Sequence, residues 1–161
     1  MINYNVLSEK TKVWIYQSDK PFAAADIPAI RAKIQEFTQN WVSHSNDLKA
    51  FGDVYHDRFV VLMVDEASSS ASGCSIDESV HFIKKLGQQY NMDMFDRMNF
   101  TYKTAEGIKS AHREEFIELY RMGLITDKTV VFNNLVATKE AFEKKWEISL
   151  GESWHKQLIA N

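Results

Sequence analysis

The sequence contains few of the residues that cross-link small proteins or form linkers between domains. Its 161 residues include one cysteine, two prolines and six glycines. Because Cys74 is the single cysteine, an intramolecular disulfide and a metal site built from several cysteines of one chain are excluded. The sequence contains no internal repeat and no proline-rich or charged linker. We therefore expect a single α+β domain over residues 1–161.

The sequence also lacks a large net charge and long apolar runs. The 19 basic and 22 acidic residues give a net charge of -3, which supplies no basic surface for nucleic acid or an anionic membrane. No apolar run approaches the roughly 20 residues that span a bilayer, and Met1–Lys10 lacks the pattern of a secretory signal. We expect a cytoplasmic protein with no nucleic-acid partner and no membrane insertion.

The first half of the chain predicts a strand, a helix and a hairpin. Residues 12–17 are rich in β-branched and aromatic side chains, and a turn follows at 18–21, which is typical of a strand. Apolar residues then recur at helical spacing, which predicts a helix with one buried face: Ile27, Ile30, Ile34, Phe37 and Trp41. Residues 48–55 and 58–65 predict a hairpin that turns at His56-Asp57. Since Phe59–Val64 does not alternate, we expect a central strand buried on both faces.

A serine-rich segment, Ala67–Gly73, predicts a loop before the next helix. Ser75 and Glu78 have the spacing of a capping box, so we expect that helix to begin at Ser75. Its buried stripe is predicted to be Ile76, Val80, Ile83 and Leu86, and its solvated side Asp77, His81, Lys84 and Gln88.

The order of elements predicts the fold. With a further short strand at Phe100–Lys103, the chain runs strand, helix, strand, strand, helix, strand, which is the order of a ferredoxin-like, split βαβ unit with an antiparallel sheet. The remaining residues predict a helix at 113–121, a strand at 129–132, a helix at 138–146 and a turn of helix near Trp154. We expect this C-terminal helical extension, or else a partner, to cover the second face of the sheet.

Val60–Glu66 has the form of a Walker B strand, in which apolar residues end in an Asp-Glu pair. In ATPases such a pair holds magnesium and orients water, but the sequence contains no Gly-x-x-x-x-Gly-Lys-Ser/Thr loop to bind the phosphates. Buried strands that enter acidic turns produce the same pattern. The match alone therefore does not predict ATP hydrolysis.

The strand end and the following helix start form the candidate ligand-binding site. The site comprises two carboxylates, a flexible loop and a helix N-terminus: Asp65, Glu66, Ser72, Gly73, Cys74, Ser75 and Asp77. Free amides of Ser75, Ile76 and Asp77 would suit a phosphate or carboxylate. The alternative is an ordinary capped helix, whose acidic residues already balance its dipole.

Cys74 offers a different chemistry. A helix N-terminus favours the thiolate, and His81 is a conceivable base, although it lies nearly two turns along the helix. The alternative is a cysteine that packs as a small apolar residue. The five histidines are scattered singly, so the spacing predicts no metal site: His44, His56, His81, His112 and His155.

Four segments, Val13–Asp19, Val64–Glu66, Ala71–Asp77 and Phe132–Val136, together resemble a family of small uncharacterised bacterial proteins that often bear the label ABC transporter ATPase. The resemblance covers most of the chain. It implies an ATPase-like role associated with a transporter and assigns no catalytic residue.

Three hypotheses about function follow. The first is a non-enzymatic binding or accessory domain that uses the candidate site for a small ligand or a protein partner. The second is a small enzyme or redox protein that depends on Cys74, and the third is the ATPase-like role that the resemblance implies. The sequence indicates no cofactor.

Overall fold

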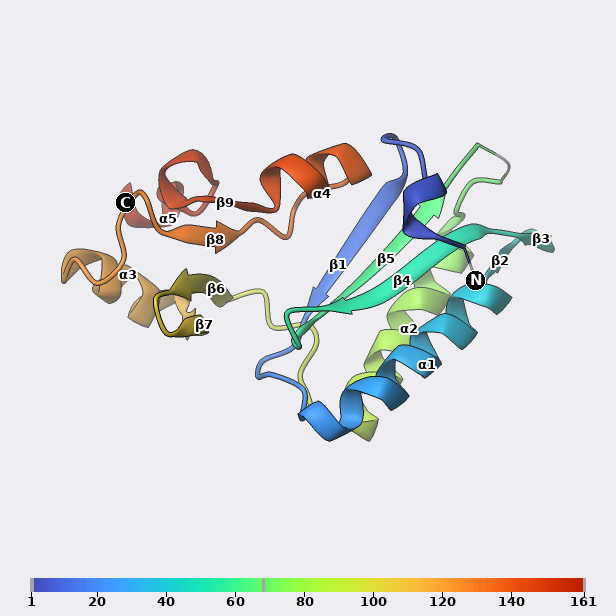
Figure 1. The fold of residues 1–161 in the computed structure, drawn as a ribbon, viewed down its shortest axis with the longest axis horizontal. Coiled ribbons are helices and arrows are strands. Elements are labelled where there is room, and N and C mark those ends of the chain that lie inside the picture. The colour runs from blue at the N-terminus through green and yellow to red at the C-terminus, as the bar shows by residue number, and fades with distance from the viewer. Residues whose placement is uncertain (1, 68, 161) are drawn as a thin grey trace. The chain divides into compact units, whose positions relative to one another are not determined.

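The computed structural model describes residues 2–67 and 69–160 (Figure 1). The chain forms two compact units. The first runs up to Phe95 and includes Ala137–Glu140, and the second comprises Asp96–Val136 and the chain from Ala141 onward. The expectation of one domain over residues 1–161 stays a prediction.

The first unit is built on a three-stranded antiparallel sheet. Its strands lie in the order β1-β5-β4, so β5 pairs with both others. The hairpin between β4 and β5 turns at His56 and Asp57, as predicted, and both residues have positive φ. The elements of this unit are η1 (Tyr4–Val6), β1 (Lys12–Gln17), η2 (Ala24–Asp26), α1 (Ile27–Asn40), β2 (Val42–Ser43), β3 (Asn46–Asp47), β4 (Lys49–Tyr55), β5 (Phe59–Asp65) and α2 (Gly73–Gln89).

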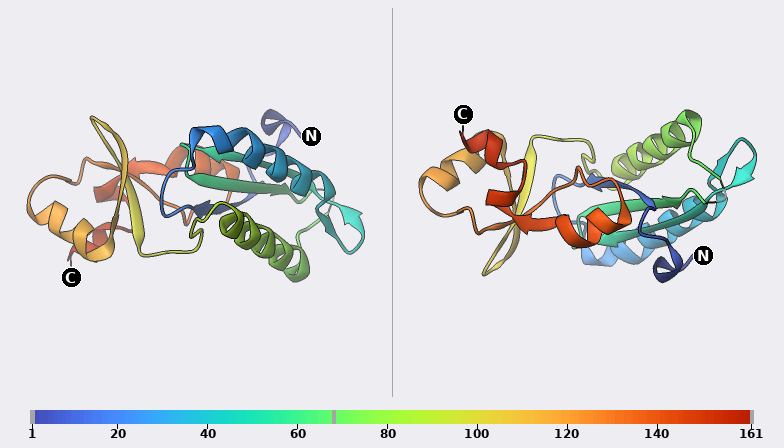
Figure 2. Two further views of the ribbon diagram at one scale, coloured as in Figure 1. Left: turned by 90° about the horizontal axis from the view of Figure 1, so that it is seen from below. Right: turned by 90° about the horizontal axis from the view of Figure 1, so that it is seen from above.

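Helices α1 and α2 cover the same face of this sheet, as Figures 1 and 2 show. Val60, Leu62 and Val64 of β5 pack there against Ile30 and Ile34 of α1 and Ile83 of α2. Residues Val61 and Met63 point to the second face and are also fully buried within the chain. The prediction of a central strand buried on both faces is therefore confirmed.

The ferredoxin-like arrangement is not confirmed by the strand order. Strands β1 and β4, which α1 joins, flank β5, but the fourth strand expected from Phe100–Lys103 belongs to a different sheet. In the first unit the free edge of β1 instead meets residues 137–139. Val13 donates to the Ala137 carbonyl and Lys139 to the Thr11 carbonyl, and Lys12 forms an isolated antiparallel bridge with Thr138.

Helix α2 begins two residues earlier than predicted. Ser72 is its N-cap, and the capping box joins Ser72 to Ser75 rather than Ser75 to Glu78. The buried face is shifted accordingly: Ser75 and Ser79 are buried together with Ile83 and Leu86, whereas Val80 is 38% exposed. The predicted solvated side is confirmed, because Asp77, His81, Lys84 and Gln88 are all exposed.

The second unit contains a four-stranded antiparallel sheet in the order β7-β6-β8-β9. Phe100, Phe116, Val131 and Leu150 form the centre of its apolar core. Its elements are β6 (Asn99–Thr104), β7 (Gly107–His112), α3 (Arg113–Arg121), β8 (Val130–Phe132), β9 (Glu147–Ser149), η3 (Leu150–Glu152) and α5 (Lys156–Ala160); α4 (Lys139–Lys145) begins in the segment that belongs to the first unit.

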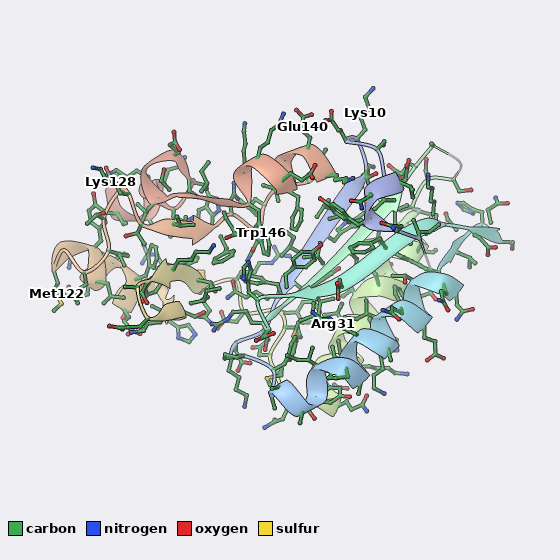
Figure 3. All side chains as sticks on the ribbon, viewed as in Figure 1. Lys10, Arg31, Met122, Lys128, Glu140 and Trp146 are labelled. Atoms are coloured by element: carbon green, nitrogen blue, oxygen red, sulfur yellow. The ribbon has the colours of Figure 1, made fainter. Side chains whose placement is uncertain are left out.

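The C-terminal part of the chain was predicted as a mainly helical extension, but it also contains a sheet. Helix α3 has the predicted bounds, and α4 lies within the predicted helix, but β7 and β9 were not foreseen. The turn after α3 carries Met122, which is 63% exposed and labelled in Figure 3. No described helix is long and apolar enough to cross a membrane.

Candidate functional site

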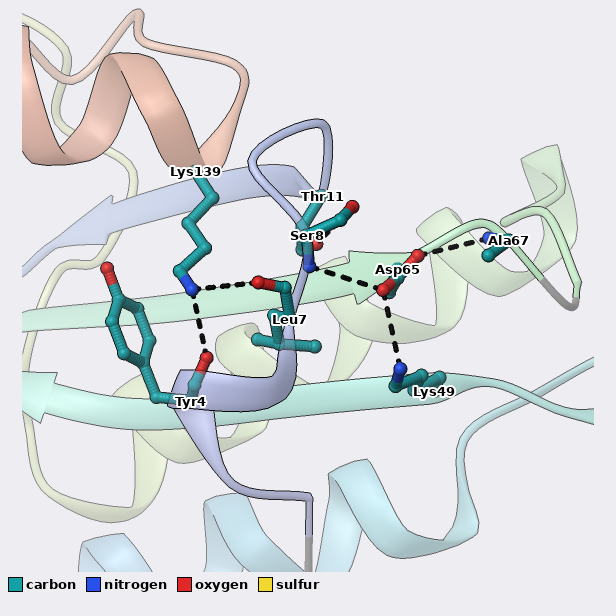
Figure 4. A network of polar contacts seen from close by, with 8 residues as sticks. All are labelled: Tyr4, Leu7, Ser8, Thr11, Lys49, Asp65, Ala67 and Lys139. Atoms are coloured by element: carbon teal, nitrogen blue, oxygen red, sulfur yellow. Dashed lines mark hydrogen bonds and ion pairs between the residues drawn. The ribbon is translucent and has the colours of Figure 1, made fainter.

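Asp65 is the last residue of β5, and its carboxylate is held by the protein (Figure 4). Its Oδ1 accepts a hydrogen bond from the Ala67 amide at 3.1 Å. Its Oδ2 accepts one from the Ser8 amide at 3.4 Å and lies 3.5 Å from the Lys49 ammonium. Lys49 reaches it because the two residues are cross-strand partners in the sheet.

These contacts set the ionisation of Asp65. Burial of the carboxyl group acts to raise its pKa, but the amides of Ala67 and Ser8 and the charge of Lys49 together outweigh burial, so the pKa is lowered. Asp65 is thus a stable carboxylate with partners on both oxygens. Because the residue is only 5% exposed, its carboxylate lies inside the fold, where it anchors the strand end to Ser8, Ala67 and Lys49.

Glu66 fixes the loop that follows the strand. Its Oε1 lies 2.9 Å from the Lys12 ammonium, and its Oε2 accepts a hydrogen bond from the Ala71 amide at 2.8 Å. The strand end and the helix start are therefore brought together through Glu66. The predicted serine loop is short and tied at both ends; Ser68 lies outside the described residues.

The first turn of α2 satisfies much of its own polar backbone. The Ser72 hydroxyl accepts a hydrogen bond from the Ser75 amide at 3.2 Å, and the Ser72 amide donates to the Ser75 hydroxyl at 2.6 Å. The Ile76 amide donates to the Ser72 carbonyl. The amides of Ser75 and Ile76, which we expected to be free for an anion, are thus occupied. Since Gly73 is the first helical residue and does not have positive φ, its conformational freedom is not used there.

Ser75 is buried because α2 begins against Trp41. The indole Nε1 of Trp41 donates to the Ser75 carbonyl at 2.8 Å, and both residues are buried. Gly73, Cys74 and Asp77 are exposed. Three of the seven predicted site residues therefore lie on the surface at the start of α2, whereas Asp65 and Ser75 are buried.

Cys74 is an exposed free thiol, so the prediction of a buried packing cysteine does not describe it. His81 is also exposed. In residues 2–67 and 69–160 the structure gives no contact between the Cys74 thiol and the His81 ring. Exposure alone does not activate a thiol, because reactivity depends on the fraction of thiolate.

Lys139 is a polar residue beside this network that the sequence did not indicate. It is 7% exposed. Its ammonium donates to the carbonyls of Tyr4 at 3.1 Å and Leu7 at 2.9 Å, and it lies 4.2 Å from the centre of the Tyr4 ring. Figure 4 shows these contacts beside those of Asp65. No local pattern could have found them, since Tyr4 and Lys139 lie 135 residues apart.

Among the described residues no group of three or more His, Cys, Asp or Glu side chains is placed to hold a metal ion. Comparison of the chain with family models, with curated proteins and with solved structures gives no significant match.

Proposed function

We propose that this chain is a non-enzymatic binding or accessory module, and that its contact surface is the exposed start of α2. The observation that carries the proposal is the state of Asp65, whose two oxygens already have partners on the protein. Glu66 ties the loop before this surface to the strand end, and the exposed side chains of Cys74 and Asp77 are available to a protein or a small ligand. A cytoplasmic location belongs to the same proposal.

Three hydrogen-bonded contacts hold the start of α2 in place. Glu66 holds the loop before α2, Trp41 holds the first turn, and the Ser72–Ser75 box closes the helix end. Because this surface is already ordered, less conformational entropy is lost when a partner binds to it. Such a surface suits recognition, whereas a catalytic carboxylate would be left accessible.

Cys74 supplies the probe for testing this proposal. A benzophenone maleimide attached to Cys74 should capture a partner on irradiation, and the same label on a Cys74→Ser/Lys145→Cys protein provides the control at another exposed position. We expect capture at Cys74 that is lost when Asp77→Arg and Glu78→Arg are introduced. If both label positions capture the same species equally, or the arginine variants capture as well as the parent, the start of α2 is not the contact surface.

The alternative function is a small enzyme or redox protein that uses Cys74, and the exposure of the thiol favours it. The rate of alkylation in the folded protein, measured against pH, decides between the two. A midpoint well below the free-thiol value of about 8.5 supports a nucleophile. A midpoint at or above that value removes this alternative, because an accessible thiol with an ordinary pKa is not activated.

The family resemblance implies a third role, that of an ATPase-like protein associated with a transporter. This role predicts saturable binding of ATP with magnesium. Calorimetry with both present tests it directly: the absence of any saturable heat would exclude it, independently of the behaviour of Cys74.

A further inference from the structure

A cavity of about 600 Å³ lies at the C-terminal end of α2, away from the candidate site at the start of that helix. Three segments of the first unit line it: the turn after β1 at Asp19-Lys20, the last two turns of α2, and the loop Asn91–Phe95. Its volume falls in the range of small-molecule sites, about 300–1,000 Å³.

The cavity is shaped by the backbone around it. Helix α2 ends in a Schellman arrangement, in which Asn91 has positive φ, the Asn91 amide bonds the Gln88 carbonyl and the Met92 amide bonds the Gly87 carbonyl. Gly87 is required there, because a Cβ at this position would lie 2.6 Å from the Met92 carbonyl oxygen. The loop therefore folds back closely over the end of the helix.

Asp19 fixes the same loop from the other side. The Asp19 amide donates to the Asp93 carbonyl at 2.9 Å, and the Asp93 amide donates to the Asp19 carboxylate at 3.0 Å. The Asp93 carboxylate in turn accepts from the Phe95 amide at 2.9 Å. Both acidic residues of the lining are thus engaged with backbone donors that hold the loop in place.

The two lysines of the lining are not engaged in this way. Within residues 2–67 and 69–160, the ammonium groups of Lys20 and Lys84 make no hydrogen bond or ion pair. The two residues come from different segments, the turn after β1 and helix α2, and both line the cavity. The carbonyls at the end of α2 are already used by the amides of Tyr90, Asn91 and Met92. The two lysines balance the charges of Asp19 and Asp93, and among the charged groups of the lining the two ammonium groups are those without a hydrogen-bond partner in the described residues.

The lining also offers an apolar surface. Ile83 and Met94 are buried beneath it, and the accessible apolar groups are Met92, which is partly buried, and Phe95, which is 40% exposed. The Phe95 ring makes an edge contact with Tyr16, at 5.9 Å between ring centres, which fixes its position. A large exposed aromatic beside a cavity provides a face on which an apolar group can lie.

We propose that this cavity binds a small organic anion: a carboxylate or phosphate group that pairs with Lys20 and Lys84, on an apolar body that lies against Met92 and Phe95. The proposal does not depend on the contact surface at the start of α2, because the two features share no residue. Each can fail without the other.

The test is an NMR titration of the full chain with four probes. Phenyl phosphate and phenylacetate carry both parts of the proposed ligand, benzyl alcohol carries the ring alone, and inorganic phosphate carries the anion alone. We expect saturable shifts of the amides of Lys84, Gln88 and Phe95 with at least one of the two combined probes, at affinities at least fivefold tighter than with either partial probe. Tighter binding of phenyl phosphate identifies a phosphate ligand, and tighter binding of phenylacetate a carboxylate.

Matched lysine variants locate the anion. Lys20→Met and Lys84→Met should each weaken the better probe at least fivefold, since a charge-assisted hydrogen bond is lost. Lys85→Met is the control, because Lys85 is the next residue on α2 and is exposed but does not line the cavity. The proposal is overturned if no probe gives saturable shifts, if benzyl alcohol binds as tightly as the anions, or if Lys85→Met weakens binding as much as Lys84→Met.

Discussion

The ammonium group of Lys139 lies 4.2 Å from the centre of the Tyr4 ring and donates a hydrogen bond to the Tyr4 carbonyl. This buried cation has no carboxylate partner among the described residues. Two carbonyls and an aromatic face replace it, and together they hold the N-terminal segment of the chain against residues 137–140. Asp65 holds the same segment through the Ser8 amide.

Lys139→Met should therefore release the N-terminal segment. The substitution keeps roughly the length of the side chain but removes the ammonium donor of the buried Leu7 carbonyl, at a cost of about 1–3 kcal/mol. The Tyr4 carbonyl still accepts a hydrogen bond from the Leu7 amide. Urea unfolding measures the loss. Hydrogen exchange should become faster at residues 3–11. The control is Lys145→Met, an exposed lysine on the same helix, which should change neither quantity.

Asp65→Asn should destabilise the protein by about 1–3 kcal/mol at neutral pH, because the amide cannot replace a carboxylate that accepts two hydrogen bonds and faces an ammonium. Urea unfolding at pH 7 compares it with Asp77→Asn, an exposed acid near the start of α2, which should be neutral. Equal loss in both variants would mean that the carboxylate of Asp65 has no anchoring role.

The pH dependence of Asp65 has a definite sign. Its pKa in the folded protein is below the ordinary value of 3.8, so the folded state binds this proton less readily than the unfolded state. The stability that Asp65 provides is complete above about pH 4 and is lost as the pH falls through the folded pKa. In Asp65→Asn the unfolding free energy should fall less steeply below pH 4 than in the parent.

Gly52→Ala should disturb the contact between β4 and α1. An added Cβ would lie 2.6 Å from a methyl group of Ile34 and 2.9 Å from one of Leu62, both of which are fully buried. We expect a loss of about 1–3 kcal/mol in thermal or urea unfolding, as in other overpacked cores. Gly73→Ala is the matched control, because nothing lies within 4 Å of its Cβ position, and alanine is the better helix former. A Gly52→Ala protein as stable as Gly73→Ala would contradict the close packing.

The parts of this structure that sequence predicts are those with local causes. Helix α1 follows from apolar residues at helical spacing, and β5 from an unbroken apolar run. The acidic pair was correctly placed at the end of that strand. The anchoring role of Asp65 was not predicted. Ser8 lies 57 residues from Asp65 in sequence, and no local pattern indicates a contact over that distance.

The start of α2 shows a second limit of prediction from local sequence. Ser72 and Ser75 both suit an N-cap, and local preference does not choose between them. The structure places Ser75 one turn inside the helix, where Trp41 binds its carbonyl. With the helix held in this position, Ser75 and Ser79 face inward and Val80 faces solvent. The fourth strand was misplaced for a similar reason, since the order of elements does not specify which strands pair.

His155 provides the last prediction. Its ring is 1% exposed, stacks on Trp154 at 4.1 Å between ring centres and lies near Phe100 and Phe116. Burial lowers its pKa from 6.5 to about 4. The folded protein therefore keeps the ring neutral over a range of pH in which the unfolded chain binds a proton.

The stability that depends on neutral His155 is complete above about pH 6.5 and is lost as the pH falls toward 4, by about 3 kcal/mol in total. Urea unfolding across this range should show the slope, and His155→Phe should reduce it. His81→Gln is the control, since that ring is exposed. Because His155→Phe removes the hydrogen bond between Ser153 and Nδ1, 2.6 Å in length, a histidine NMR titration of the parent serves as the second measurement. A ring that titrates near 6.5 in the folded protein would show that water reaches this aromatic cluster, and the acid sensitivity would then need a different cause.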